Sequence, residues 1–137
     1  MVVIDAQGAV VGRLGARVAK LLLAGQKVEI INADKAVMLG TLSSAREKYL
    51  SRRHQKNKRT PEDSPVWPRV PHLLLRRIIR GMLPWSSRRG RDAHHLLKVS
   101  SGAQEGKSTR IQEASSSEKH GMFTLSELCV ELGGKAN

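Results

Sequence analysis

The spacing of apolar residues in the first 40 positions is that of a strand, then a helix, then two further short strand-like runs. The run Val2–Ile4 is β-branched and is followed by turn residues, as expected of a buried strand. From residue 10 onward, apolar positions recur every three or four residues, which predicts an amphipathic helix with a buried face of Val11, Leu14, Val18, Leu21 and Leu22. Gly25 follows where a C-terminal cap belongs, and strand-like runs cover residues 27–31 and 36–39. This order predicts an α/β domain with a right-handed crossover between parallel strands.

The middle of the chain contains one polar helix and one amphipathic helix. Ser44 to Glu47 has the pattern of a capping box, and the helix that it opens is basic almost throughout. Prolines exclude regular helix between residues 60 and 71, so that stretch is expected to run extended over the surface. A second helix begins at Pro71, and its apolar stripe is Leu74, Leu75, Ile78, Ile79 and Met82. Gly81 weakens this helix, Pro84 ends it, and residues 96–99 return as a strand.

The last part of the chain differs in composition from the rest. Residues 100–120 contain almost no apolar side chains, which favours an irregular extension. A capping box from Thr124 to Glu127 then opens a short helix over residues 124–132, with apolar side chains Leu125, Leu128, Val130 and Leu132. Because so short a helix is unstable alone, it is expected to dock on its own domain or on a neighbouring protein. We therefore predict one domain over residues 1–99 and a C-terminal extension over residues 100–137.

The net charge of +12 indicates a polyanionic partner, although it carries no information about the fold. Residues 1–100 hold 20 of the 24 lysines and arginines but 7 of the 12 acidic residues, so the extension is not part of the basic surface. Cys129 is the single cysteine; we expect it on the buried face of the C-terminal helix, in a reducing compartment. No apolar run approaches the roughly 20 residues of a membrane span, and the N-terminus has no secretory-signal pattern.

Basic side chains gather in two segments on either side of the proline-rich stretch. The first is the polar helix with the residues that follow it, and the second spans residues 72–98 and includes an arginine-rich loop at 86–91. Forked guanidinium groups suit phosphate oxygens, and two basic segments on one domain are typical of nucleic-acid binding. Trp67 is expected to anchor the proline-rich stretch, with stacking on a base as the alternative. The predicted nucleic-acid-binding residues are Arg46, Lys48, Arg52, Arg53, His54, Lys56, Lys58, Arg59, Arg69, Arg76, Arg77, Arg80, Trp85, Arg88, Arg89, Arg91 and Lys98.

Two other groups of residues raise alternative functions. Gly8, Gly12 and Gly15 lie at the first strand-to-helix turn, where a nucleotide phosphate would bind a helix N-terminus, but their spacing matches neither a dinucleotide fingerprint nor a P-loop. They are interpreted as serving a tight turn and close packing. His94 and His95 suggest acid–base chemistry, yet no paired carboxylates or metal-ligand spacing accompany them. A nucleotide-dependent enzyme built on the glycine turn, and a free RNA- or DNA-binding regulator, are the alternatives to a structural RNA-binding protein.

Several stretches within residues 2–100 resemble the large-subunit ribosomal protein thirteen family, namely Val3–Gly8, Gly12–Leu14, Ile31–Lys35, Arg80–Pro84, Arg89–Arg91 and Leu96–Val99. The ending, from Phe123 to Gly133, is similar to that of archaeal members. The resemblance implies a three-layer α/β/α single domain with a small, mostly parallel four-stranded sheet. It implies a non-enzymatic constituent of the large ribosomal subunit, in the cytoplasm, without cofactor or metal. The implied partners are large-subunit rRNA, bound early in assembly, and neighbouring ribosomal proteins, contacted through the C-terminal extension; the resemblance implies neither a membrane nor a small-molecule substrate.

Overall fold

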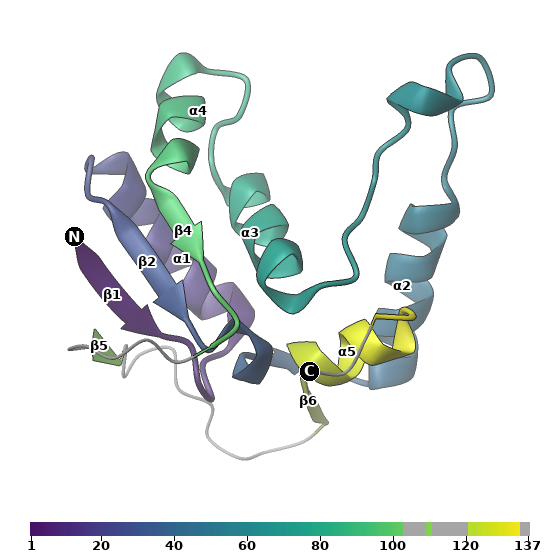
Figure 1. The fold of residues 1–137 in the computed structure, drawn as a ribbon, viewed down its shortest axis with the longest axis horizontal. Coiled ribbons are helices and arrows are strands. Elements are labelled where there is room, and N and C mark those ends of the chain that lie inside the picture. Colours follow the sequence, from purple (N-terminus) through teal and green to yellow (C-terminus); the bar gives the residue numbers. More distant parts are fainter. Residues whose placement is uncertain (103–108, 111–120, 135–137) are drawn as a thin grey trace.

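The computed structural model describes residues 1–102, 109–110 and 121–134 (Figure 1). The helices are α1 (Val11–Leu23), α2 (Leu42–His54), α3 (Pro71–Met82), α4 (Arg88–His95) and α5 (Leu125–Glu131). The strands are β1 (Val2–Asp5), β2 (Val28–Ile31), β3 (Val37–Leu39), β4 (Leu97–Val99), β5 (Thr109–Arg110) and β6 (Met122–Thr124), with two 3-10 turns, η1 (Ala33–Lys35) and η2 (Pro61–Asp63). The predicted strand–helix–strand order of the first 40 residues is confirmed, and so is the helix start at Pro71.

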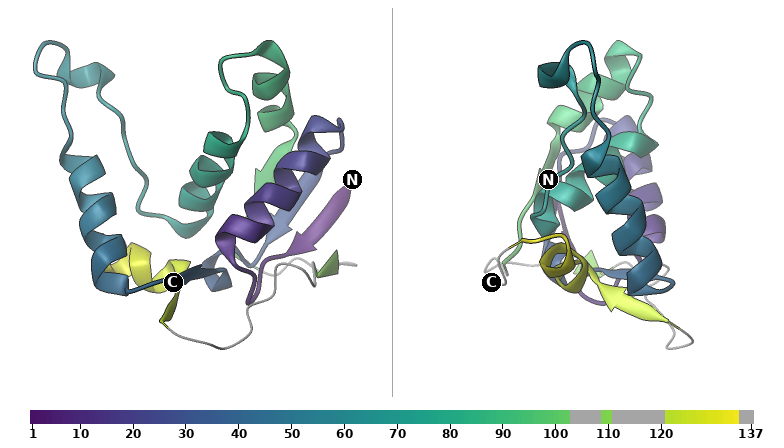
Figure 2. Two further views of the ribbon diagram at one scale, coloured as in Figure 1. Left: turned by 180° about the vertical axis from the view of Figure 1, so that it is seen from behind. Right: turned by 90° about the vertical axis from the view of Figure 1, so that its right-hand side faces the viewer.

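A small parallel sheet with strand order β4–β2–β1–β5 forms the centre of the fold. Val2, Val28 and Leu97 are in register across the three longer strands. As right-handed crossovers require, α1, α3 and α4 lie together on one face of this sheet (Figure 2). The α/β class and the small sheet of four parallel strands are confirmed. The expected three-layer α/β/α arrangement is not found among the described residues, because α1, α3 and α4 all lie on the same face.

The core lies between the sheet and the two amphipathic helices, α1 and α3. Its largest fully buried side chains in this region are Ile4, Leu14, Val18, Leu22, Val28, Ile30, Leu74, Leu75 and Ile79. A Cβ atom at Gly15 would lie 2.7 Å from the sulfur of Met82, so this glycine permits the close approach of the two helices. The prediction that Met82 is buried is wrong: it lies on the last turn of α3 and is 39% exposed, and Leu83 enters the core in its place.

The C-terminal helix packs onto its own chain. Strand β6 pairs antiparallel with β3, and α5 packs against η1, α2 and α3. The predicted capping box is confirmed, because the Thr124 hydroxyl accepts from the Glu127 N–H and the Glu127 carboxylate accepts from the Thr124 N–H. Cys129 is buried as expected, whereas Val130 is 45% exposed because it lies off the face that carries Leu125, Leu128 and Leu132. Most of the irregular segment predicted over residues 100–120 lies outside the described residues.

The predicted capping box of the polar helix is wrong. Helix α2 begins at Leu42 with Thr41 as its N-cap, and no side chain caps it. Gly40, at φ +114°, turns the chain before this point, in a conformation that glycine adopts at little cost. Ser44 and Glu47 therefore lie inside the helix.

The arginine-rich loop predicted over residues 86–91 is mostly helical. Helix α4 begins at Arg88, and the Ser87 hydroxyl accepts from the Gly90 N–H at 3.2 Å, so Ser87 caps the N-terminus of this helix. A Cβ atom at Gly90 would lie only 2.1 Å from the Pro84 carbonyl oxygen. The glycine thus allows the chain to fold back on the Pro84 turn and to continue as a helix.

Candidate RNA-binding surface

The two predicted basic segments lie on opposite sides of the connection between α2 and α3 (Figures 1 and 2). This connection, residues 55–70, extends away from the C-terminus of α2 and returns to the N-terminus of α3. Because α2 ends at His54, three of the predicted basic residues, Lys56, Lys58 and Arg59, lie on the connection rather than on a helix. Cationic groups therefore reach this surface from α2, α3, α4 and the connection.

Trp67 anchors the connection, as predicted. Its indole packs edge-to-face on Tyr49, the buried residue of α2, with ring centroids 5.6 Å apart. Its carbonyl accepts a hydrogen bond from Arg53, and its side chain packs against the hydrophobic core. One residue of the proline-rich stretch thus fixes the path of the chain between the two basic helices.

Three arginines of the surface lie on indole rings. The guanidinium carbon of Arg52 lies 4.9 Å from the Trp67 ring centroid, and that of Arg77 lies 4.5 Å from it. On the next turn of α3, Arg80 lies 3.9 Å from the Trp85 centroid. Such contacts contribute about 0.5–1 kcal/mol each at exposed sites, and they restrict long side chains that are otherwise flexible. The structure therefore brings together four predicted residues, Arg52, Arg77, Arg80 and Trp85.

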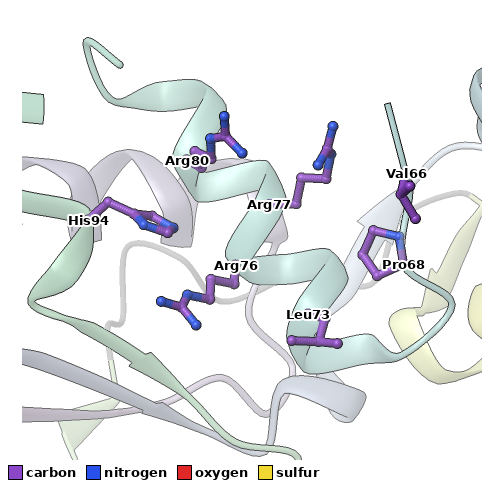
Figure 3. Close-up of a pocket in the computed structure, with 7 residues that line it drawn as sticks. All are labelled: Val66, Pro68, Leu73, Arg76, Arg77, Arg80 and His94. Atoms are coloured by element: carbon purple, nitrogen blue, oxygen red, sulfur yellow. The ribbon is translucent and has the colours of Figure 1, made fainter. Parts of the chain in front are cut away.

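Two adjacent pockets share Arg77 and Arg80 as a common wall. The first, here called the histidine pocket, has a volume of about 260 Å³ and is lined by Val66, Pro68, Leu73, Arg76, Arg77, Arg80 and His94. The second, here called the tryptophan pocket, has about 300 Å³ and is lined by Trp67, Arg77, Arg80, Gly81, Leu83 and Trp85. Figure 3 shows the guanidinium groups of Arg77 and Arg80 extending to the same side of α3, whereas Arg76 extends toward the side of His94.

His94 was not among the predicted RNA-binding residues. Its ring packs edge-to-face on Trp85, with centroids 5.3 Å apart, a contact that exists only because α4 folds back beside α3. Burial lowers the pKa of His94, and the charges of Arg76, Arg80 and His95 lower it further. Nε2 of His94 and Nε of Arg76 are both buried without a hydrogen-bond partner in the described part of the chain. Two residues that line the histidine pocket thus each hold a buried polar atom without a partner in the described residues.

Several other predicted residues are placed differently by the structure. Arg46 pairs with Glu131 of α5 at 3.4 Å, and Arg69 donates to the Gly133 carbonyl. Lys98 lies 2.8 Å from the carboxylate of Glu29, which is almost fully buried, so the charge of this lysine is compensated within the sheet. The predicted residues that are exposed and line neither of the two pockets are Lys48, His54, Lys56, Lys58, Arg59, Arg88, Arg89 and Arg91.

Two of the three glycines of the first turn serve the fold as interpreted, whereas Gly12 has open space around a built Cβ and no positive φ. Gly8 adopts φ +68° and donates its N–H to the Lys35 carbonyl, and Gly15 packs against α3. Within residues 1–102, 109–110 and 121–134, no group of three His, Cys, Asp or Glu side chains is arranged to hold a metal ion. In the same ranges, no helix is long and apolar enough to cross a membrane.

Comparison with known proteins gives one consistent result. A family model described as "Ribosomal protein L13" matches residues 1–106. A protein of Methanococcus maripaludis named "Large ribosomal subunit protein uL13" is 40% identical over 98% of this chain and 99% of its own length. A protein of the same name from Methanococcoides burtonii is 39% identical over 98% of this chain and 99% of its own length. A third, from Methanosarcina barkeri, is 44% identical over 72% of this chain and 69% of its own.

Proposed function

The chain belongs to the ribosomal protein L13 family, and from this premise we propose that it is a structural constituent of the large ribosomal subunit that binds large-subunit rRNA. The observation that carries the proposal is the arrangement of Arg52, Arg77 and Arg80 on two indole rings, between helices that come from distant parts of the sequence. Neighbouring ribosomal proteins are the second class of partner, and the C-terminal extension is the part that we assign to them.

The mechanism that we propose is electrostatic and depends on RNA shape. Arginines and lysines of α2, α3, α4 and the connection neutralise phosphates that come close together where RNA helices pack. The α/β core holds the groups of α3 and α4, and Trp67 and α5 position those of α2, so the protein recognises the course of the RNA backbone more than its base sequence. Several members of the predicted set already have a partner in the protein and would have to share or release it on binding RNA. The side chains of Arg46, Arg88 and Lys98 lie near carboxylates, and those of Arg53, Arg69, Arg89 and Arg91 donate to backbone carbonyls.

Sedimentation of cell extract through a sucrose gradient tests the proposal. The protein should migrate with the large subunit at moderate salt and dissociate at high salt, because the binding is dominated by phosphate contacts. If it joins early in assembly, it should also be present in light precursor particles of the large subunit. Recovery at the top of the gradient under moderate salt would instead identify a free RNA- or DNA-binding regulator.

A structural role also means that the protein has no catalytic activity of its own. The enzyme alternative requires a nucleotide site at the turn of Gly8, Gly12 and Gly15. Titration with a nucleoside triphosphate, followed by tryptophan fluorescence, separates the two: measurable affinity that is lost on changing Gly12 would favour the enzyme.

A further inference from the structure

The tryptophan pocket has the composition of a site for one nucleotide, with flat ring surfaces for a base and cationic groups for its phosphate. It lies at the C-terminal end of α3, and it is flanked by Trp67 from the connection and Trp85 from the turn before α4. Arg77 and Arg80 lie on these indoles, and Leu83 supplies a buried apolar side chain. We propose that this pocket takes a single unpaired base of the bound RNA, which leaves the helical stack to enter it.

The chemistry of the pocket matches both parts of a nucleotide. Bases that leave a helix are bound by stacking on aromatic rings or on guanidinium planes, and both kinds of surface are present here. The guanidinium N–H groups of Arg77 and Arg80 suit the phosphate that accompanies the base. The volume of about 300 Å³ is at the lower end of the roughly 300–1,000 Å³ typical of small-ligand pockets, which suits one base rather than a stack of bases.

Gly81 keeps this pocket open. It lies in the last turn of α3 with no positive φ, and a Cβ atom built there has no neighbouring atom within 4 Å. Packing within the described residues thus gives no reason for a glycine at this position, although alanine is favoured in helices by up to about 1 kcal/mol. Gly12 on α1 has equally open surroundings, so what distinguishes Gly81 is its place in the wall of the pocket, where an added side chain would enter the space proposed for the base.

The arginines are already positioned for such a ligand in the free protein. Arg77 is partly buried, and burial together with the nearby charge of Arg80 lowers its pKa. The two cations are thus held close together, and a phosphate between them would relieve their repulsion. Because the indoles restrict both side chains beforehand, less conformational entropy is lost on binding.

The inference rests on the proposed function, and two RNA probes distinguish a failure of the inference from a failure of the proposed function. One probe is a hairpin with a fully paired stem; the other has the same stem with a single bulged 2-aminopurine, a fluorescent adenine analogue. Affinities are measured by fluorescence anisotropy with the full chain, and the 2-aminopurine emission is recorded on saturation. The bulged hairpin should bind about tenfold more tightly or better, as base–aromatic stacking implies, and its emission should change when the base meets the pocket.

The variant Gly81→Leu fills the pocket without removing a charge. The matched control is Gly12→Leu, because Gly12 is also exposed, helical and free of neighbours around a built Cβ, but lies on α1. Gly81→Leu should bind both hairpins with the affinity of the wild type for the paired one, whereas Gly12→Leu should keep the preference for the bulge.

The outcomes are distinct. If neither hairpin binds the wild type, the proposed RNA-binding function fails and the inference fails with it. If both bind equally, the function stands and the inference is overturned. It is also overturned if Gly81→Leu retains the preference, if both leucine variants lose it alike, or if the 2-aminopurine emission of the wild-type complex is that of the free probe. This last measurement needs no variant, so a folding defect in Gly81→Leu leaves the inference testable.

Discussion

Replacing Gly90 with alanine should detach α4 from the turn that precedes it. The added Cβ would lie 2.1 Å from the Pro84 carbonyl oxygen and 2.5 Å from the Pro84 carbonyl carbon, where distances under 3.0 Å are essentially never found. A flexible side chain can rotate away from such a contact, but the obstacle here is backbone. The start of α4 must therefore move by close to an ångström, or the Pro84 turn must open.

The expected loss of stability is worked out from two opposing effects. Overpacking costs about 1–3 kcal/mol, and the upper end applies because the obstructing atoms cannot rotate away. Alanine returns up to about 1 kcal/mol through its better helix propensity. The free energy of unfolding should thus fall by about 2 kcal/mol, and the melting temperature should fall by roughly 8 °C in a domain of this size.

Urea denaturation followed by circular dichroism measures this loss, with Gly81→Ala as the matched control. Gly81 is also helical, but the space around its built Cβ is open, so the same substitution should leave stability unchanged or raise it by up to about 1 kcal/mol. A Gly90→Ala variant within about 0.5 kcal/mol of the wild type would refute the reasoning. It would mean that α4 does not pack on the Pro84 turn in solution, and that the position of its arginines is not fixed.

Three further predictions concern the surface and the C-terminal helix. Replacing all three arginines of α4 with alanine should reduce the slope of log binding constant against log salt concentration for rRNA by up to about three, one for each phosphate that is no longer neutralised. Thermal unfolding should be nearly unchanged. An unchanged slope would place these arginines away from the RNA. Burial raises the pKa of the Cys129 thiol to about 11, so a thiol reagent at pH 8 should react with it only as fast as the protein opens; immediate reaction in the folded state would contradict its burial. The pKa of His94 is lowered in the folded protein, so the unfolded state binds the proton more readily, and the free energy of unfolding should fall as the pH drops through about 6.5. The variant His94→Asn should flatten this dependence of stability on pH. A variant with the same pH profile of stability as the wild type would exclude a role for His94.

The sequence predicts the parts of this fold that follow from local periodicity. The stripe of Leu74, Leu75 and Ile79 repeats at helical spacing, and each of the three is fully buried. The Thr124 capping box is a contact between residues three apart, so it too can be predicted from the sequence. The pattern from Ser44 to Glu47 is of the same kind and fails, because the conformation of Gly40 starts the helix earlier and nothing in the pattern itself shows that conformation.

The candidate site depends mainly on contacts that periodicity does not show. Arg52 and Arg77 are 25 positions apart, and only the folded connection brings both to the ring of Trp67. Helix α4 could not be predicted for a similar reason, since a helix that starts at Arg88 requires the close approach of Gly90 to Pro84. The residue types of the surface could thus be predicted from charge and motif, whereas the pairing of each cation with an indole or an anion could not.

The geometry of the basic surface depends on residues that carry no positive charge. Helix α2 has little apolar area of its own, and Tyr49 is its buried residue, so helix propensity and packing of α2 alone cannot fix its direction. Its position is set by Trp67 on one side and by α5 on the other, where Arg46 also pairs with Glu131. Loss of α5 would therefore change the position of the α2 cations relative to those of α3 without removing any cation of either helix. If the proposed function holds, the C-terminal helix should contribute to RNA binding through the position of α2, even though residues 101–137 add no net positive charge to the surface.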